Sequence, residues 1–577
     1  MLTNFKRLVL QNTTQSVLVI FLTLWFLLNL IQAKYTGLHP DEAYYWLFTQ
    51  FLQWGYFDHP PAVAIFIKGG SFIHNTLGLR LFTCITNAAS VYLLWLIVKK
   101  YQANSWVFIT LFSSVLLFHI YGFITTPDAP LFFFSVLFLY VYQHYLVNNK
   151  LLIAILLGLI VAALLYSKYH GILLLFFVLL SNFKLFKHPS FYVIIMVALI
   201  VYAPHIYWQY QNNYPSLQYH LFDRSVKAYE LNFTTQYLLD FVLMCGPLTG
   251  WLLIYSSFKQ KINNDVFLRS LNFVFYGIFI FFFISTFKGN TQAHWPLIGF
   301  IPIVILATIG LSQNQILWHK KWIKVLFITN ISLIILCRLC IIMPPKALCK
   351  IDFVANFNSF DIWAQQIRSY AKNYPVIFLD GFQDPSLYNY YTQSTKGFDY
   401  DSYTYRKTQF EIFPLEDSIR NKTVYFITTK SHQNPHQDTL KTIKGIYYGL
   451  WLDSVRIYQK VNFAPLQPAQ QWRVNQTKTL FFKIENPYNQ AINFGNNGQK
   501  YTVSLRYAVQ NYEDIILLKD VNKAQFNNLI LPIGTTKTIA IKITAPTKAG
   551  NYKYFISLQT SPFAGSRNSL MLKMYVN

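Results

Sequence analysis

The chain has 577 residues, of which 54% are hydrophobic, 18% are aromatic and only 12% are charged. Because a soluble globular protein carries about 25% charged residues, this composition excludes a soluble fold over most of the chain, and it also excludes the disordered and collagen-like classes. The formal net charge is +25, but the cations form no basic run or nucleic-acid motif, so we expect no nucleic-acid partner.

Apolar segments long enough for membrane spans recur up to Met343. The first is longer than the apolar core of a signal peptide and lacks a small-residue cleavage site after it, so we expect an anchor. The composition and these segments predict a polytopic α-helical membrane protein of about eleven spans. The predicted spans are Ser16–Ala33, Leu79–Val98, Trp106–Ile124, Ala129–Val147, Leu151–Tyr166, Gly171–Phe183, Phe191–Tyr207, Leu238–Tyr255, Leu271–Thr286, Trp295–Leu311 and Val325–Met343.

The charges of the loops predict the orientation of the chain in the membrane. Lysine and arginine concentrate in the loops that face the cytoplasm when the N-terminus is inside, and an odd number of spans then places everything after Met343 outside. Among the acids of the membrane part, only Asp265 falls inside. The acids on or near the outer face are Asp41, Glu42, Asp58, Asp128, Asp223, Glu230 and Asp240. Carboxylates gathered on one face of a carboxylate-poor membrane domain indicate a functional site there.

The long first outer loop and the region after the last span predict further structure. Asp41–Gln53 and Ala62–His74 read as aromatic helices lying in the membrane interface, separated by Pro60-Pro61. Residues 346–461 predict an extracytoplasmic α/β domain, with a helix at Phe360–Asn373 and strands at Val376–Leu379 and Val424–Thr428. Residues 462–577 predict an immunoglobulin-like β-sandwich. Its expected strands are Thr479–Glu485, Thr502–Val509, Thr538–Thr544, Tyr552–Thr560 and Leu570–Val576.

The first outer loop carries the most informative motif. It reads His39-Pro40-Asp41-Glu42 and continues to Tyr56-Phe57-Asp58-His59-Pro60-Pro61. Taken alone, the two acids also suit the first turn of a helix, where they complement the helix dipole. On a helix, neighbouring side chains point about 100° apart, so Asp41 and Glu42 are not expected to face one reacting atom.

This pattern resembles the GT-C membrane glycosyltransferases. Within that class it resembles bacterial enzymes grouped with the dolichyl-phosphate-mannose protein mannosyltransferases of glycosyltransferase family 39, and the aminoarabinose lipid A transferases. The resemblance covers about residues 1–345 and is strongest over Pro40–Pro61. It implies a GT-C-like transmembrane catalytic domain over 1–345 in the bacterial inner membrane. That domain would move a hexose or pentose from a polyprenyl-phosphate carrier to a membrane lipid, glycan or protein acceptor outside the cytoplasm.

The resemblance and the chemistry suggest three catalytic candidates, Asp41, Glu42 and Asp128. Transfer to a hydroxyl needs a carboxylate as general base. Asp41 matches the family's first-loop aspartate, and attack opposite the leaving phosphate would make the enzyme an inverting one. Asp128 lies in Thr125-Thr126-Pro127-Asp128, which resembles a second outer-loop acid, although a helix cap explains it nearly as well.

The leaving phosphate needs cations or polar donors. Each residue that could supply these groups also has an interfacial or structural explanation, such as snorkelling of a lysine side chain to the lipid headgroups. His220 and Arg224 are four residues apart and would share a helix face. The candidates for substrate binding are Asp58, His59, Lys168, His170, His220, Arg224 and Lys288.

No cofactor is certain, but a divalent metal is possible. In the aminoarabinose transferases, a carboxylate of the proline-proline motif and a later histidine approach a bound metal, and the matching positions here are Asp58 and His220. Two ligands fall short of a full zinc set, and a salt bridge of Asp58 is the alternative.

Two other classes of function stay open. A transporter would place polar groups at the bilayer midplane on repeated or broken helices, and the sequence shows no repeat. A non-catalytic assembly protein of the cell envelope would bind partners through its outer domains. Release of free polyprenyl phosphate from a sugar-loaded carrier would distinguish a transferase from both.

Overall fold

The computed structural model describes residues 2–223, 228–260, 264–345, 347, 351–355, 357–431, 436–467, 470–512, 514–521 and 526–577. The chain divides into two compact units, which we describe separately. The first unit comprises Met1–Ser216 and Tyr229–Asn358, and the second comprises Leu217–Ala228 and Ser359–Asn577. The sequence-based division at residues 345/346 and 461/462 stays a prediction.

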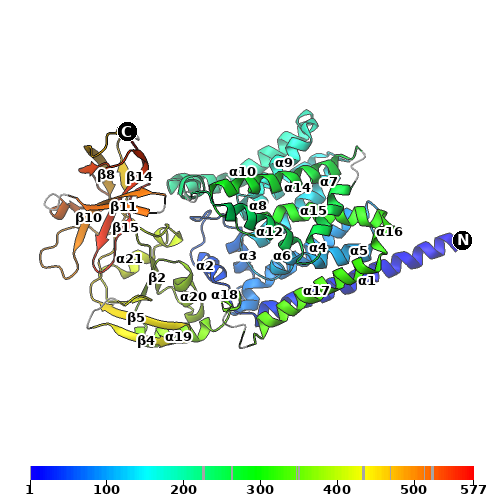
Figure 1. The fold of residues 1–577 in the computed structure, drawn as a ribbon, viewed down its shortest axis with the longest axis horizontal. Helices are drawn as coiled ribbons and strands as arrows, with labels where there is room; N and C mark the ends of the chain where they lie inside the picture. The colour runs from blue at the N-terminus through cyan, green and yellow to red at the C-terminus, as the bar shows by residue number, and fades with distance from the viewer. Residues whose placement is uncertain are drawn as a thin grey trace. The chain divides into compact units, whose positions relative to one another are not determined.

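The first unit is a bundle of helices (Figure 1). Its longer helices are α1 (Leu2–Tyr35), α2 (Pro40–Phe48), α3 (Ala62–Gly69), α4 (Thr76–Lys99), α5 (Ser105–Ser114), α7 (Asp128–Tyr145), α8 (Leu151–Ser167), α9 (Gly171–Ser181), α10 (Pro189–Gln211), α12 (Leu231–Cys245), α13 (Gly250–Lys259), α14 (Val266–Ser285), α15 (Leu297–Gln313) and α17 (Lys321–Ile342). The short helices α6 (Leu116–Ile120), α16 (Gln315–Trp318) and α18 (Asp352–Ala355) lie between or after them, and α11 (Pro215–Gln218) lies at the division between the units.

The helices are those of a multi-pass membrane protein. Each predicted span coincides with one helix or with a broken pair, and the two predicted interfacial helices are α2 and α3, both shorter than expected. Among the described residues, five helices are long and apolar enough to cross a bilayer, namely α1, α4, α10, α14 and α17, and the bent pair α12/α13 raises this to six. The exact number of eleven spans therefore stays a prediction.

Two predicted spans are broken. The predicted span over Leu238–Tyr255 is not one straight helix, because α12 and α13 meet at an angle of 87°. The break falls at Gly246, which has φ +151°, a conformation that favours glycine, and at Pro247, which has no N–H to continue a helix. The span over Trp106–Ile124 is interrupted at Val115, whose extended backbone separates α5 from α6.

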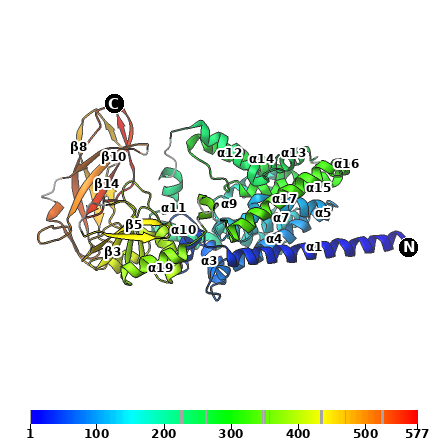
Figure 2. The same cartoon turned by 60° about the horizontal axis from the view of Figure 1, so that its bottom comes forward.

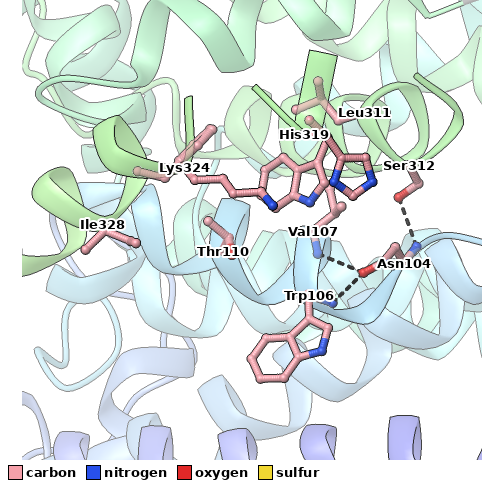
Figure 3. Close-up of a pocket in the computed structure, with 11 residues that line it drawn as sticks. Asn104, Trp106, Val107, Thr110, Leu311, Ser312, His319, Lys324 and Ile328 are labelled. Carbon is pink, nitrogen blue, oxygen red and sulfur yellow. Dashed lines mark hydrogen bonds between the residues drawn. The ribbon is translucent and has the colours of Figure 1, made fainter. Parts of the chain in front are cut away.

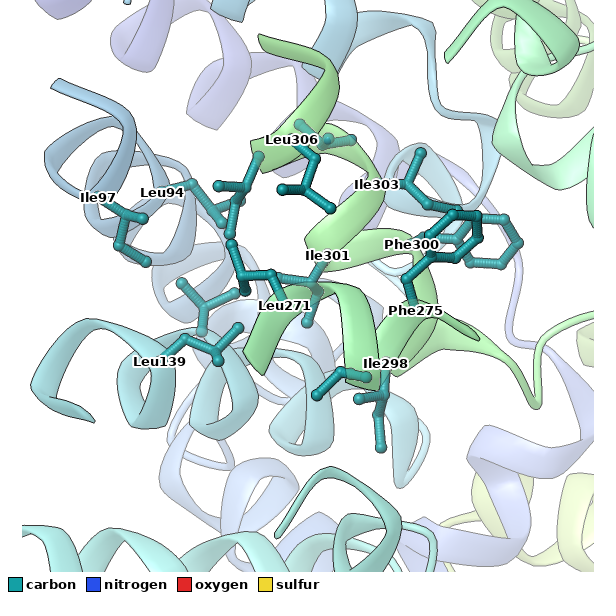
Figure 4. Close-up of a cluster of buried hydrophobic side chains, with 14 of the residues drawn as sticks. Leu94, Ile97, Leu139, Leu271, Phe275, Ile298, Phe300, Ile301, Ile303 and Leu306 are labelled. Atoms are coloured by element: carbon teal, nitrogen blue, oxygen red, sulfur yellow. The ribbon is translucent and has the colours of Figure 1, made fainter. Parts of the chain in front are cut away.

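A single buried helix, α15, forms the centre of the bundle. It is apolar on every side, as expected for a helix surrounded by protein, and nearly all of its residues are buried. Figure 4 shows Ile298, Phe300, Ile301, Ile303 and Leu306 of α15 together with side chains from three other helices. These are Leu94 and Ile97 of α4, Leu139 of α7, and Leu271 and Phe275 of α14. The 17 residues of α15 are therefore surrounded by the side chains of neighbouring helices.

The second unit begins with an α/β layer. Strands β1 (Val376–Leu379) and β2 (Gly397–Tyr400) pair in parallel, and β3 (Val424–Thr428), β4 (Asp438–Thr442) and β5 (Gly445–Leu452) complete a sheet in the order β2-β1-β3-β5-β4. Helices α19 (Phe360–Ala371) and α20 (Gln383–Thr392) precede and follow β1, and α21 (Leu415–Ile419) precedes β3. The strands predicted at Val376–Leu379 and Val424–Thr428 are confirmed, as is the helix from Phe360.

The remainder of the second unit is a β-sandwich (Figure 2). One sheet has the order β11-β10-β14-β16-β7 with β15 beside β14, and the other has the order β13-β8-β6, while β9 and β12 pair separately. Leu480, Phe482 and Ile484 of β8 alternate with exposed residues, and they share one core with Leu505 and Tyr507 of β10. The strands are β6 (Phe463–Pro465), β7 (Gln470–Trp472), β8 (Thr477–Glu485), β9 (Ile492–Asn493), β10 (Val503–Asn511), β11 (Asp514–Asp520), β12 (Ile530–Leu531), β13 (Thr536–Thr544), β14 (Gly550–Thr560), β15 (Ser566–Arg567) and β16 (Leu572–Val576).

The α/β layer and the sandwich are joined by buried contacts. The ring of Phe563 stacks on Tyr400 at 4.2 Å between centroids and meets Phe426 edge-on at 5.1 Å. The buried carboxylate of Glu416 accepts a hydrogen bond of 2.6 Å from the Tyr488 hydroxyl. Removal of the sandwich would expose these side chains, so the two parts are mutually dependent.

The partly buried acid Asp384 predicts how the second unit responds to pH. Burial raises the pKa of Asp384 from the ordinary 3.8 to about 6, against the opposing influence of Lys444. Its stabilising neutral form is present below about pH 4 and is lost as the pH rises through about 6. We therefore expect Asp384→Asn, which keeps the side chain neutral, to raise the melting temperature of the full chain at pH 7.5 and to leave it unchanged at pH 4. Equal effects at both pH values in thermal unfolding would contradict this prediction.

Candidate active site

Helix α2 begins with a reciprocal cap that separates the two acids of the first loop. His39 is the N-cap: its Nδ1 accepts from the backbone N–H of Asp41 at 3.3 Å, and its own N–H donates to Oε2 of Glu42 at 3.0 Å. Pro40 occupies the first turn, where it costs no hydrogen bond. Glu42 is fully buried, whereas the Asp41 side chain is 36% exposed. The expectation that the two acids face different directions is confirmed.

Glu42 forms a buried two-pronged ion pair with Arg80 of α4. Nε and Nη2 of Arg80 donate to the two carboxylate oxygens at 2.8 and 2.5 Å, and both side chains are 0% exposed. The other Arg80 donors satisfy the backbone carbonyls of Ala33, Thr36 and Gly37 at 3.1, 2.7 and 2.8 Å. This one guanidinium therefore holds the end of α1, the start of α2 and α4 together.

The same carboxylate also orders the chain that leads into α7. The backbone N–H of Thr125 donates to Oε1 of Glu42 at 2.8 Å. The Thr125 hydroxyl lies 2.7 Å from that of Thr83 on α4. Because Thr125 precedes Asp128 by three residues, Glu42 fixes the position of both of the other catalytic candidates.

Asp128 lies in the first turn of α7 and pairs with Lys168. The Lys168 ammonium donates to both carboxylate oxygens at 2.8 and 2.9 Å, and both side chains are buried. Nε2 of His294 approaches the same carboxylate at 3.7 Å. Two spans that follow each other in sequence, α7 and α8, thus bring the acid and the lysine together.

Tyr121 lies within electrostatic reach of both Asp128 and Asp41. Its ring is 6.2 Å from that of His294. Asp41, Tyr121, Asp128, Lys168 and His294 thus gather at one end of the first unit, and we call them the acidic cluster. They come from α2, the chain after α6, the start of α7, the chain after α8 and the chain before α15.

Four other predicted site residues of the first unit are Asp58, His59, His170 and Lys288. Asp58 is buried and acts electrostatically on Tyr169, next to Lys168. His59 meets the ring of Tyr45 edge-on at 5.7 Å. The remaining two lie further along the chain: His170 packs edge-on against Phe282 and Trp295 at 5.2 and 5.9 Å, and Lys288 is exposed after α14.

The later loop holds the predicted metal ligand His220 and the predicted phosphate ligand Arg224. His220 belongs to the second unit, where its ring contacts Tyr219 at 5.0 Å. Arg224 lies outside the described residues. Among the residues that the structure describes, no group of three or more His, Cys, Asp or Glu side chains could hold a metal ion. The described residues therefore do not form a complete metal site.

An apolar cavity lies beside the first loop. It has a volume of about 420 Å³ and is lined by the ends of the loop, by α3 and by α7 and α8. Leu52, Trp54 and Ile65 at its rim are more than half exposed, as suits side chains that face lipid. The full lining is Leu52, Gln53, Trp54, Pro61, Ala62, Ile65, Phe66, Phe134, Ala163 and Tyr166.

Sequence reasoning missed Arg80, Tyr121 and His294 as parts of the site. Arg80 had a usable signal, because a charged residue inside a predicted apolar span is a functional or structural candidate by default. Tyr121 and His294 had none, since aromatic residues are abundant at the ends of all the spans.

The buried Glu42–Arg80 pair predicts a large effect on the stability of the first unit. Glu42→Gln leaves the Arg80 guanidinium buried without a counter-ion, which costs about 3–5 kcal/mol for pairs of this kind. We expect Arg80→Met to cost a similar amount and the Glu42→Gln/Arg80→Met double variant to cost less than the sum of the two, measured by unfolding in detergent. Strictly additive costs would show that the two side chains act independently.

The comparisons with known proteins cover both the sequence and the fold. Residues 58–208 match the model of the dolichyl-phosphate-mannose-protein mannosyltransferase family. This range holds the second half of the first loop, Arg80, Tyr121, Asp128 and Lys168. No curated protein sequence matches the chain significantly.

Two crystal structures of ArnT from Cupriavidus metallidurans resemble the chain in fold. The apo structure has a TM-score of 0.56 at 12% identity and covers 76% of this chain and 98% of ArnT. The structure bound to undecaprenyl phosphate has a TM-score of 0.52 at 13% identity and covers 75% and 98%. The resemblance expected from the first loop is confirmed: the chain has an ArnT-like fold of the GT-C type, and residues 58–208 match the family model of the dolichyl-phosphate-mannose-protein mannosyltransferases.

Proposed function

We propose that the protein is a glycosyltransferase that moves a sugar from a polyprenyl-phosphate carrier to an acceptor hydroxyl on the outer side of a cytoplasmic membrane. The mannosyltransferase match over 58–208 and the ArnT-like fold support a transferase that uses a lipid carrier. The carrier class is supported by the ArnT structure with undecaprenyl phosphate.

One observation carries the assignment of the base: Asp41 is the accessible carboxylate of the acidic cluster. Glu42 and Asp128 are buried and held by Arg80 and Lys168, whereas the Asp41 side chain is 36% exposed. A general base must reach the acceptor hydroxyl. We therefore assign the catalytic role to Asp41 and a positioning role to Glu42.

The reaction follows from this placement. The acceptor oxygen attacks the anomeric carbon of the carrier-bound sugar, and Asp41 takes the hydroxyl proton. A new C–O bond forms on one face while the bond between the anomeric carbon and the phosphate oxygen breaks on the other. The configuration at that carbon inverts, and polyprenyl phosphate leaves with its negative charge.

Cations near the cluster would stabilise that leaving phosphate. Lys168 is held by Asp128 at 2.8 Å, which orients the ammonium but neutralises it in part. Arg224 supplies the second cation in our proposal, since a guanidinium binds phosphate through two parallel donors. His59, His170, His220 and Lys288 are further candidates for contacts with the sugar and the phosphate.

The apolar cavity beside the first loop suits the isoprenoid chain. Its lining is mostly aromatic and aliphatic, and it includes Pro61, the last residue of the motif that carries Asp58 and His59. A carrier in this cavity would keep its tail in the hydrophobic layer and its phosphate at the loop. The acceptor, which is a lipid, glycan or protein, would approach from the outer side, where we place the second unit.

Asp41→Asn tests the proposed base. The variant keeps the size and polar contacts of the side chain but cannot accept the proton, so we expect turnover to fall roughly 10²–10⁴-fold. An exposed acid in a first turn contributes only about 0.3–1 kcal/mol, so folding and carrier binding should survive. The measurement is release of polyprenyl phosphate from a sugar-loaded carrier by purified enzyme, with melting temperature and carrier affinity recorded in parallel.

Glu42→Gln is the matched control. We expect it to lower the melting temperature and to retain activity per folded molecule well above that of Asp41→Asn. A stable, inactive Glu42→Gln beside an active Asp41→Asn would move the base to Glu42. Activity in both variants would make Asp128 the next candidate, and no release by the wild type would remove the transferase assignment.

Arg224→Ala and Lys168→Ala test phosphate recognition. Each charge-assisted contact to phosphate is worth about 1.5–3 kcal/mol, so each variant should raise the carrier's dissociation constant about tenfold or more. Because Lys168→Ala also leaves Asp128 buried without its cation, Lys168→Ala/Asp128→Asn serves as the neutral reference. Unchanged carrier affinity in Arg224→Ala would make Arg224 an ordinary interfacial cation.

A further inference from the structure

The first unit has a second pocket, distant from the acidic cluster. It has a volume of about 400 Å³, within the range of roughly 300–1,000 Å³ typical of ligand sites. Its walls are the start of α5, the end of α15, α16 and the start of α17 (Figure 3). The full lining is Asn104, Trp106, Val107, Thr110, Leu311, Ser312, Trp318, His319, Lys324, Phe327 and Ile328.

Helix α15 separates this pocket from the acidic cluster. His294 of the cluster lies three residues before α15 begins, whereas Leu311 and Ser312 of the pocket lie in its last turn. A helix of 17 residues is about 25 Å long, close to the thickness of the hydrocarbon layer. The pocket therefore lies at the opposite membrane face, which the loop cations predict to be cytoplasmic.

The polar side of the pocket is cationic. Figure 3 shows the Lys324 side chain extending from α17 over the pocket toward His319. No carboxylate lies within ion-pair distance of either side chain among the residues that the structure describes. Asp265, the acid predicted on this face, caps α14 through the N–H of Leu268 and accepts from the Tyr101 hydroxyl at 2.9 Å. An anion would therefore complement the pocket.

The wall opposite Lys324 is rigid and partly polar. Oδ1 of Asn104 caps α5 by accepting from Trp106 and Val107 at 2.9 and 3.3 Å. The Asn104 N–H donates to the Ser312 hydroxyl at 2.9 Å, which joins α5 to the end of α15. This wall is thus formed by the capped start of α5, which is hydrogen-bonded to the last turn of α15.

The apolar side of the pocket faces lipid. Trp106 and Ile328 are 60% and 64% exposed, and both lie on helices of the membrane-embedded bundle. Tryptophan at this position suits the headgroup level of a bilayer. A soluble anion would occupy the cationic side and leave these side chains uncovered, whereas a lipid with a phosphate headgroup would cover both.

We propose that this pocket, named here the Lys324 pocket, binds the headgroup phosphate of an anionic glycerophospholipid. The phosphate accepts from Lys324 and from His319, and an acyl chain packs along Trp106 and Ile328. The site is independent of the proposed sugar transfer and lies at the other face of the membrane. Binding there would make the packing of α5, α15 and α17 depend on the lipid composition of that leaflet.

The test is lipid binding by the purified full-length chain in detergent, followed by native mass spectrometry. We expect phosphatidylglycerol to bind about tenfold or more tightly than phosphatidylcholine with the same acyl chains. Lys324→Ala should remove most of that difference. Lys321→Ala, which removes a cation one turn earlier that does not line the pocket, should change the affinity less than about twofold.

A second variant separates pocket binding from general surface charge. Thr110→Phe fills the cavity without changing any charge, and we expect it to weaken phosphatidylglycerol binding as much as Lys324→Ala does. Equal losses in Lys321→Ala and Lys324→Ala, or full binding by Thr110→Phe, would overturn the proposal. Displacement of the lipid by millimolar inorganic phosphate, with the same dependence on Lys324, would instead identify a soluble anion and would also overturn it.

Discussion

The buried ion pair between Glu42 and Arg80 is the constraint on which the rest of the membrane-embedded unit depends. Both side chains are 0% exposed in an apolar bundle, where an unpaired charge costs several kcal/mol. The pair is stable only if every remaining donor and acceptor finds a partner. The backbone N–H groups of His39 and Thr125 and the carbonyls at the end of α1 supply these partners. The need to satisfy one charge pair thereby fixes the loops that carry Asp41 and Asp128.

A second guanidinium extends this arrangement to the last membrane helix. Arg338 of α17 donates to Gln32 and Asn29 of α1 at 3.2 and 2.9 Å. Its guanidinium and that of Arg80 lie over the ring of Phe123 at 5.3 and 5.4 Å. Phe123 is therefore held between two cations, two residues after Tyr121 and two before Thr125. Cation–π contacts of this kind are worth about 0.5–2 kcal/mol each, and here they immobilise the segment between α6 and α7.

The sequence predicted the elements better than it predicted their partners. Apolar length placed the helices, and period-two alternation placed strands such as β8 and β10, because both signals are local. The Glu42–Arg80 and Asp128–Lys168 pairs join residues 38 and 40 positions apart, and no local signal decides which cation meets which acid. The cap of α2 was also hidden, since His39 fills a place that Ser, Thr, Asp or Asn usually takes. Glycine followed by proline at Gly246-Pro247 indicates a break in a helix, but the span was predicted from the hydrophobicity of the whole segment.

The two ion pairs explain why one carboxylate of the acidic cluster stays available for chemistry. Asp128 lies at the start of α7 and Lys168 directly follows the end of α8, so each charge complements the dipole of the helix end beside it. Glu42 accepts from Arg80 and from two backbone N–H groups. Because both carboxylates are buried and held by these donors, neither side chain is placed to approach a substrate. Asp41 shares the first turn of α2 with Glu42. Its side chain is partly exposed and lies 3.9 Å from Nδ1 of His39. The rigidity of the site thus comes from Glu42 and Asp128, and its proposed reactivity comes from Asp41.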